Sequence, residues 1–531
     1  MYYTTSWERT IHGIKGRGLT ELCLLNGFDP QRRPPELRRR LEELRRKFLC
    51  DDVHKPEGVR GGMVPPPIPE EQARRMSDDA WLSAIAHYGS GESTGWRDGR
   101  MVGDAWSQAQ VLETLTKEDP ERFARLLERI PAGSPEAYPA AVFRGLADAT
   151  VEAGVLVAVW REGLRLGGSD AERWLVRLIE ANRAWDIPVE LIEWVAGVAT
   201  GEPDPAGSGA DGDWDADRIN MDALNSTRGA AVLALGNLLA ENHGRAPVVA
   251  PALEALVGDP HVEVRAAVAA ALAPLLEIDT DRALAAFSSL TAGAAPALLS
   301  SPYFGHFLRV AVHSRRYSAV APVIAQMLAE PDESLRRSGA KWLTLASFYD
   351  SGLDPDVDAL LAGDDAAARA AAIEVFADNV AYERTRVRAV DVLSRALHDS
   401  DEDVRSAAER AFYSLGDEPL ADFAPLISAL AHSPVLVSGA SSALHSIEAS
   451  RHPLPPEVLE VCEAFVSLHR KQVADYSTGA AGGVMYVVRL TLRLHAQSSD
   501  PDVRRRTLDL IDQLVVLRAH NIESDLDGFE R

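Results

Sequence analysis

The chain has 531 residues and carries 55 Lys and Arg residues against 79 Asp and Glu residues, which gives a net charge of −24. At roughly 100–200 residues per domain, this length predicts several domains or one repeat array. The content of 46% hydrophobic and 25% charged residues excludes global disorder. Because so acidic a body repels phosphate, we expect it to bind neither nucleic acid nor an anionic membrane.

The cysteine pattern and the lengths of the apolar runs indicate in which cellular compartment the protein is expected. Cys23, Cys50 and Cys462 are odd in number and widely spaced, which predicts free thiols in a reducing environment. The N-terminus has no basic stretch followed by an apolar run, so no secretory signal is expected. No window reaches the roughly 18 consecutive apolar residues of a membrane span. We therefore expect a cytoplasmic protein.

Helical spacing of apolar residues dominates the chain. In the segment Pro35–Leu49, Leu37, Leu41, Leu44 and Phe48 form one apolar stripe of a helix. Ser77 has the character of an N-cap, followed by acidic residues that suit the positive end of a helix. Further helices are expected at about 105–116, 119–129, 135–149, 151–164, 170–182 and 188–199.

Three segments interrupt this pattern or leave it ambiguous. Residues 89–104 are rich in Gly, Ser and Asp and are expected to form a loop, and 200–217 is too polar and glycine-rich to pack. The stretch Val488–Leu494 alternates like a strand, but it lies in an unbroken run from about 479 to 497. A strand of that length would be long and solitary, so we expect a helix.

A repeat follows residue 223. Asp259–Leu272, Asp399–Phe412 and Asp500–Ile511 share an acidic turn, an arginine and a following small or apolar run. Counting weaker copies, the shared arginines stand at positions 228, 265, 336, 369, 405 and 504. Their spacings are 37, 71, 33, 36 and 99 residues, close to multiples of one unit. A fixed period in this range predicts a solenoid of stacked helix pairs, and hence an all-α fold.

The repeat residues have an architectural explanation. The Asp-containing turn ends one helix, and its acidic residues favour the positive end of the next. We expect each arginine to lie beside the acidic turn of an adjacent repeat, so that the pairs form a ladder. The predicted organisation is a helical segment with a basic helix at 1–60, a linker at 61–75, irregular helical repeats at 76–199, an acidic loop at 200–222, and a HEAT-like solenoid at 223–531.

Four segments carry a resemblance to a known family. They are Met76–Leu82, Asp119–Ala124, Leu224–Ala231 and Leu494–Gln497. In this order they resemble the long helical C-terminal region of bacterial NACHT/STAND-type P-loop NTPases. The resemblance implies a sensor that recognises a foreign protein, often viral, and that works with an NTPase domain and an effector.

The chain departs from that family at its nucleotide site. No G-x-x-x-x-G-K-[ST] motif occurs, and the nearest glycine cluster, Gly89–Gly95, lacks the lysine. We therefore do not expect this chain to bind ATP as that family does. The resemblance implies the sensor region without its NTPase domain. No cofactor is predicted.

Two groups of residues contain the side-chain types that bind metals. Asp211, Asp213, Asp215 and Asp222 match positions 1, 3, 5 and 12 of a calcium loop, but the sixth position is Ala216 where a glycine is needed. A solvated acidic loop is the favoured interpretation.

The second group consists of the pairs His306 with His313 and Cys462 with His469, which lack the close spacing of structural zinc ligands. With no hydrolase or protease motif present, the sequence assigns no catalytic, cofactor-binding or metal-binding residue.

The basic helix is a local exception to the acidic balance. Residues 1–60 carry 13 Lys and Arg against 9 Asp and Glu, a charge of +4. The basic side chains that could contact phosphate are Arg38, Arg39, Arg40, Arg45, Arg46 and Lys47. We favour pairing with Glu36, Glu42 and Glu43, or contact with the acidic body.

These observations predict a non-enzymatic protein that binds a partner protein along the concave face of its solenoid, because an extended rigid surface loses little ordering entropy on docking. An associated NTPase or effector subunit is a further expectation from the resemblance. Two alternatives stay open: a general HEAT-repeat scaffold or assembly factor, and a HEAT-like DNA glycosylase, against which the charge of −24 argues.

Overall fold

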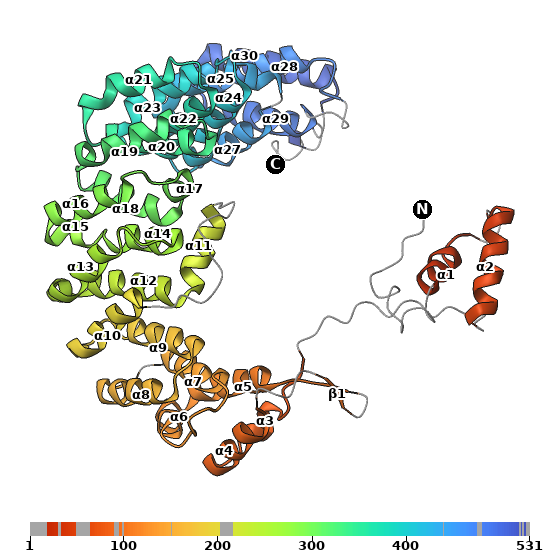
Figure 1. Cartoon of the computed structure of the whole chain (residues 1–531). Coiled ribbons are helices and arrows are strands. Elements are labelled where there is room, and N and C mark those ends of the chain that lie inside the picture. Colours follow the sequence, from red (N-terminus) through yellow and green to blue (C-terminus); the bar gives the residue numbers. More distant parts are fainter. Residues whose placement is uncertain are drawn as a thin grey trace.

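The computed structural model describes residues 18–29, 33–48, 64–89, 95–97, 100–149, 151–201, 216–438, 440–474, 480–519, 522 and 525–526. Within these ranges the chain is helical apart from one small hairpin, and most of its helices stack into a curved rod (Figure 1). The predicted all-α, HEAT-like solenoid is therefore confirmed as the fold.

Helices of the rod lie in two layers, and one layer faces the inside of the curve (Figure 1). The inner layer consists of α5 (Ala105–Glu118), α7 (Ala137–Ala147), α9 (Ser169–Ala181), α12 (Thr227–Glu241), α14 (Val262–Ala271), α18 (Pro302–His313), α20 (Glu333–Ser347), α22 (Ala366–Asp378), α24 (Glu402–Glu409), η5 (Arg410–Leu415), α27 (Ser441–Ala449) and α29 (Ala480–Gln497).

The outer layer lies on the convex side (Figure 1). It consists of α6 (Pro120–Leu127), α8 (Ala153–Leu166), α10 (Val189–Thr200), α13 (Ala246–Ala255), α15 (Leu275–Ile278), α16 (Thr280–Thr291), α19 (Tyr317–Ala329), α21 (Asp354–Leu361), α23 (Glu383–Ala396), α25 (Ala424–Ala431), α28 (Glu457–His469) and α30 (Pro501–Val516). Short connecting helices are α3 (Glu70–Ala73), α4 (Asp78–His87), η3 (His243–Arg245), α17 (Pro296–Leu299), η4 (Ser351–Leu353), η6 (Leu420–Phe423) and α26 (Pro434–Val437).

One apolar core runs between the layers from Ala73 to Ile522. It is not interrupted around residues 202–215, because α9 and α10 both pack against α12. The helices before and after this segment therefore belong to one stack. Among the described residues, no helix combines the length and the hydropathy that crossing a bilayer requires.

The expected helices are confirmed in number and place between residues 105 and 200, with ends that differ by a few residues. Ser77 is the N-cap of α4, where its hydroxyl accepts a hydrogen bond from the Ala80 N–H. The ambiguous run is the single helix α29. An α-helix makes its backbone hydrogen bonds within its own segment, so Val488–Leu494 needs no neighbouring strand although its residues alternate.

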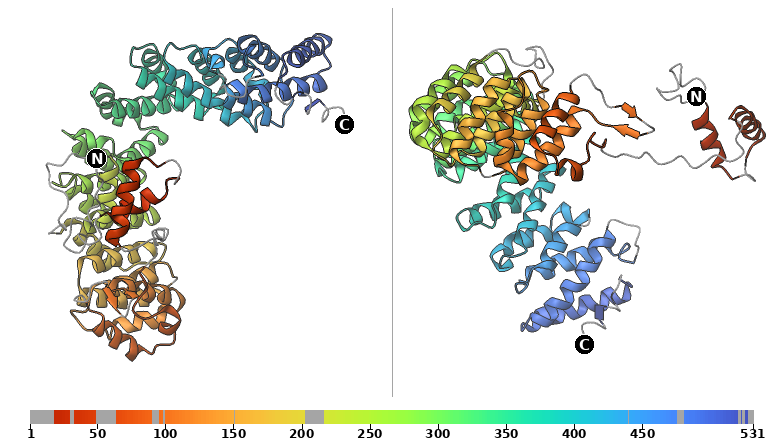
Figure 2. Two further views of the ribbon diagram at one scale, coloured as in Figure 1. Left: turned by 90° about the vertical axis from the view of Figure 1, so that its right-hand side faces the viewer. Right: turned by 90° about the horizontal axis from the view of Figure 1, so that it is seen from below.

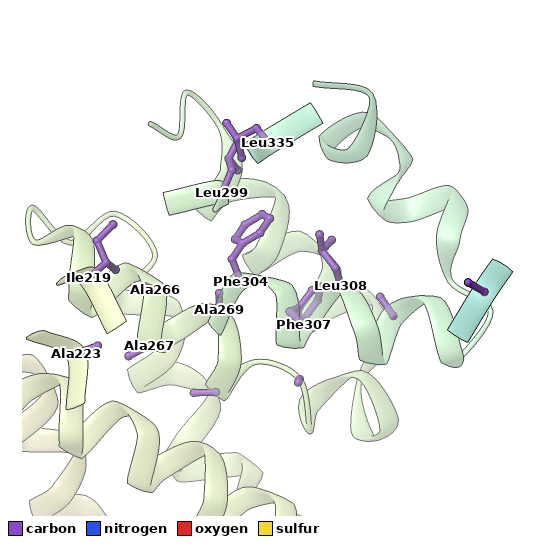
Figure 3. Packing of buried hydrophobic residues seen from close by; sticks show 14 of the residues in the cluster. Ile219, Ala223, Ala266, Ala267, Ala269, Leu299, Phe304, Phe307, Leu308 and Leu335 are labelled. Atoms are coloured by element: carbon purple, nitrogen blue, oxygen red, sulfur yellow. The ribbon is translucent and has the colours of Figure 1, made fainter. Parts of the chain in front are cut away.

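Residues 216–222 correct the expected acidic loop, because they belong to the helix α11 (Ala216–Asn225). Ile219 and Ala223, one turn apart, are fully buried where α11 packs on α12 and α14 (Figure 3). Ala266 and Ala267 of α14 lie on the facing surface, where small side chains allow close approach (Figure 3). The burial of Ile219 and Ala223 anchors this helix. Because aspartates surround these two residues in the sequence, the segment looks polar overall and its apolar side is not apparent.

Residues 89–104 also differ from the expected loop. They contain the antiparallel hairpin of β1 (Gly95–Arg97) and β2 (Arg100–Val102), in which Trp96 pairs with Met101. Strands of three residues are too short to show a period. The Asp98-Gly99 dipeptide, typical of two-residue hairpin connections, was the available signal.

The helices α1 (Leu19–Asn26) and α2 (Pro35–Phe48) form a small core of their own around Leu22, Leu41 and Leu44. The predicted apolar stripe of α2 is thereby confirmed.

Among the described residues, three of the six repeat arginines make the expected contact with the acidic turn of the next repeat. Arg405 donates instead to the carbonyl oxygens of Asp399 and Ser400 in its own turn. Arg336 on α20 donates to Asp365, 2.6 Å away, and Arg369 on α22 donates to Asp399 at 3.0 and 3.2 Å. Arg228 on α12 is paired with Asp259, and both side chains are buried. Each aspartate lies in the turn that precedes the next inner helix.

The ladder is interrupted between α14 and α20. The intervening inner helix α18 starts at Ser301-Pro302 and has Gly305 as its fourth residue, where α14 has Arg265. The direction of the stack changes in this region, between α17 and α19 (Figure 2).

Candidate functional site

The inner surface is the side of the inner layer that faces away from the outer layer. On α9 the buried residues, such as Leu175 and Ile179, face the core, so that Arg173 and Arg177 lie on the opposite, partly exposed side. The same reasoning places Lys341 of α20 on the inner surface. Three groups of side chains stand out along it.

The first group surrounds Trp174. Three guanidinium groups lie near its ring, those of Arg144 at 5.2 Å, Arg177 at 5.9 Å and Arg173 at 6.0 Å. Arg144 on α7 is fixed by Glu113 on α5, at 2.6 Å. This arrangement joins three successive inner helices around one partly buried indole.

Arg173 and Arg177 also contact the C-terminal end of α11. Arg177 donates to the carbonyl oxygen of Leu224 at 2.9 Å, and Arg173 donates to that of Asn225. Cations at the C-terminus of a helix are favourable because the last carbonyl groups lack helical partners. The arginines around Trp174 are thus held in place from two sides.

The second group is centred on Glu374 of α22. Its carboxylate lies 2.7 Å from both Arg337 and Lys341 of α20 and 3.9 Å from Arg410 of η5. Burial alone would raise the pKa of Glu374, but Lys341 and the two arginines outweigh it and lower that pKa. One carboxylate therefore fixes three cations in a row across the inner surface.

The third group lies near the C-terminal end. The rings of His445 on α27 and Tyr486 on α29 are 5.0 Å apart, and Arg489 lies 4.0 Å from Glu448. Arginine, tyrosine and tryptophan are the side chains that interfaces and their hot spots favour. The inner surface can therefore present rigid aromatic and guanidinium groups to a macromolecule.

Of the four calcium-loop candidates, the structure describes only Asp222. Asp211, Asp213 and Asp215 lie outside the described residues. Asp222 is in α11, with one carboxylate oxygen 3.6 Å from Arg218. Within the described ranges, no three His, Cys, Asp or Glu side chains are grouped as a metal site requires.

The other two pairs have packing partners. His306 and His313 both contact Arg309, through its side chain and its carbonyl oxygen respectively. Cys462 is buried and is a free thiol among the described residues, and His469 bonds the Leu436 carbonyl oxygen at 2.8 Å. These contacts fit structural roles.

The basic helix α2 pairs two of its arginines with carboxylates. Arg40 bonds Glu21 and Glu43, and Arg39 lies 3.9 Å from Glu43. Arg45 donates to the Asn26 side chain. Of the three expected glutamates, Glu43 is paired, and Glu21 of α1 supplies a further carboxylate. The preference for pairing over phosphate binding stays a prediction.

Sequence reasoning missed the groups around Trp174, Glu374 and Tyr486. A signal existed for the first: Arg173, Trp174 and Arg177 stand together on the polar side of a helix whose apolar side is regular. The cross-helix partners, such as Arg144, are distant in sequence and follow no motif.

The stacked helix pairs define the class of this protein as a HEAT-like α-solenoid. No protein-family model and no curated protein sequence matches the chain. Among solved structures, it is similar to the karyopherin Kap121p bound to the SUMO protease Ulp1p, with 11% identity, a TM-score of 0.47, and coverage of 99% of this chain and 54% of that one. A second similar structure is Kap95p with RanGDP, with 13% identity, a TM-score of 0.42, and coverage of 86% and 63%. The chain thus spans about half the length of the first of these proteins.

Proposed function

We propose that this chain is a scaffold that binds a partner protein along the inner surface of its solenoid. The observation that carries the proposal is the set of arginine and aromatic side chains held by cross-helix ion pairs around Trp174, Glu374 and Tyr486. Because these side chains are already ordered, docking costs little conformational entropy.

Affinity capture with matched charge reversals tests this proposal. Lys341→Glu changes the inner surface, and Arg395→Glu changes an exposed position on the outer helix α23, where its ion-pair partner is also exposed. Capture is done from cells of the source organism, with quantitative mass spectrometry and a thermal-melting check of folding. The proposal expects the partner to be recovered with the wild type and with Arg395→Glu but to be depleted with Lys341→Glu. Equal recovery with both variants contradicts it.

We propose further that the partner is a foreign protein and that the chain acts as the sensor of an NTPase-type defence system, in the cytoplasm. The support is the resemblance of Met76–Leu82, Asp119–Ala124, Leu224–Ala231 and Leu494–Gln497 to the sensor region of NACHT/STAND-type proteins. Capture from phage-infected cells is expected to recover a phage protein, together with an NTPase or effector subunit. Recovery of the same host proteins before and after infection favours a general assembly scaffold instead.

A further inference from the structure

Four of the repeat arginines share one position within the inner helices, whereas Arg228 is the second residue of α12. Arg265 is the fourth residue of α14. Arg336 is the fourth residue of α20, Arg369 the fourth of α22 and Arg405 the fourth of α24. In α9 the fourth residue is Glu172. This position therefore carries a negative charge in α9, where four of the later inner helices carry a positive one.

A cavity of about 640 Å³ opens at this position. It lies at the edge of the solenoid, where the outer helices α8 and α10 end and the inner helices α9 and α12 begin. The apolar part of its wall includes Trp194, Val198 and Leu164, of which Leu164 is 48% exposed. This volume is within the range of about 300–1,000 Å³ that ligand sites occupy.

Glycines form much of the remaining wall. Five of them line the cavity, and Gly167 and Gly168 have φ angles of 68° and 101°, a backbone conformation that other residues rarely adopt. At the end of α8 the chain therefore turns without a side chain that would fill the space.

Within the part of the chain that the structure describes, Glu172 is the charged group of this wall without a counterion. Arg228, which also lines the cavity, is paired with Asp259 and donates to the Ala199 carbonyl oxygen at 3.0 Å. Among the described residues, no hydrogen bond or ion pair engages the Glu172 carboxylate, and partial burial raises its pKa. A cation in the cavity would remove the cost of leaving that carboxylate incompletely solvated.

We propose that this edge cavity binds the arginine side chain of a peptide segment of a partner protein, with Glu172 as its counterion and Trp194 as its stacking surface. A guanidinium group suits both groups at once, because it pairs with a carboxylate through two parallel hydrogen bonds and stacks on an indole. The binding reproduces across two chains the arginine–carboxylate contact that the ladder makes between repeats. This site lies at the edge and not on the inner surface, so it does not depend on the proposed scaffold function.

Isothermal titration calorimetry on the full chain tests the assignment. The probe is the pentapeptide acetyl-Gly-Ala-Arg-Leu-Ala-amide, compared with the same peptide carrying citrulline, which keeps the shape of arginine but has no charge. Spermidine provides a cation without a peptide. The variants are Glu172→Gln and, as a matched control, Glu193→Gln, an exposed carboxylate on α10 next to Trp194.

The wild type and Glu193→Gln are expected to bind the arginine peptide equally. Glu172→Gln is expected to bind it about tenfold more weakly, the loss typical of one charge-assisted pair, and the citrulline peptide is expected to bind at least as weakly as that. Each variant is first shown to melt like the wild type. Unchanged binding by Glu172→Gln, equal binding of the citrulline peptide, or binding of spermidine alone overturns the proposal.

Discussion

Asp399 joins two successive repeats through one carboxylate. It accepts hydrogen bonds from the Nε and Nη2 of Arg369, at 3.2 and 3.0 Å, and from the backbone N–H of Asp401 in its own turn, at 2.8 Å. Asp365 has the same double role, since it caps α22 and pairs with Arg336. The aspartate of each turn therefore shapes the turn and fixes the preceding inner helix at the same time, which makes stacking and local structure interdependent.

The buried pair of the ladder is expected to be the most sensitive one. The side chains of Arg228 and Asp259 are only 8% and 5% exposed. Asp259→Ala leaves the guanidinium buried without its counterion, which is expected to destabilise the stack by about 3–5 kcal/mol. Hydrogen exchange of the amides in α12 and α14, together with chemical denaturation, measures this loss.

The control for that prediction is Asp391→Ala on α23. Asp391 and Arg395 form a pair in which both side chains are more than two-thirds exposed, so the change is expected to cost about 0–1 kcal/mol. If both variants unfolded at the same denaturant concentration, the buried ladder pair would contribute no more to the stability of the stack than an exposed ion pair, which contradicts the prediction.

Acid is expected to weaken the ladder. Burial alone would raise the pKa values of Asp365 and Asp399, but their hydrogen bonds and the paired arginines outweigh it, and both pKa values are lowered. A carboxyl group with a lowered pKa stabilises the folded state at a pH above its unfolded value of about 3.9, and this stabilisation is lost as the pH falls through the folded value.

The pH dependence can be assigned to one carboxyl group by comparing wild type with Asp399→Asn. The melting temperature of the wild type is expected to fall more steeply than that of the variant when the pH drops from about 5 to 3. Parallel curves would mean that the pairing of Asp399 does not contribute to acid stability.

Particular residues show how far the sequence alone could lead. The arginines at a period of 33 to 37 residues predicted both the solenoid and the contact between Arg369 and Asp399. In a repeat protein, equivalent residues make equivalent contacts in successive repeats. Helix α11 and the hairpin around Trp96 escaped prediction because each has too few apolar residues to show a period.

The candidate sites were harder to predict than the fold. The cross-helix partners of Trp174 and Glu374, such as Arg144 and Arg337, are about 30 residues or more away in sequence, and surface side chains follow no packing rule. The sequence alone could not identify Glu172 as a candidate binding residue, because this requires knowing that it is the fourth residue of an inner helix. The concave surface as a whole was predicted, whereas its individual residues were not.

Close packing between the inner helices makes a specific glycine necessary. A Cβ atom at Gly236 of α12 would lie 2.7 Å from the Ala271 Cα and 2.9 Å from its Cβ, so Gly236→Ala forces α12 and α14 apart. We expect a loss of about 1–3 kcal/mol, as for other overpacked cores. Thermal and chemical denaturation measure it.

Gly197 on α10 provides the matched comparison for that substitution. A Cβ atom there would meet no atom of the described residues within 4 Å, so Gly197→Ala is expected to stabilise the chain by about 0.5–1 kcal/mol through helix propensity. Destabilisation by Gly197→Ala, or tolerance of Gly236→Ala, would contradict this account of the layer.

Cys462 reports on the integrity of the C-terminal repeats. Complete burial raises the pKa of its thiol to about 12, so almost no thiolate is present at neutral pH. Peptide mapping after iodoacetamide treatment at pH 8 is expected to find Cys462 unmodified in the native chain and modified in denaturant. Rapid native modification would show that α28 opens locally or packs differently.

Site-specific photocrosslinking tests most directly whether the inside of the curve is the binding surface. A photoreactive amino acid is placed at Ser442, exposed on the inner helix α27, and separately at Asp391, exposed on the outer helix α23. Irradiation in cells of the source organism is expected to attach one partner protein to position 442 and nothing specific to position 391. Attachment of the partner at position 391 with none at position 442 would contradict the account.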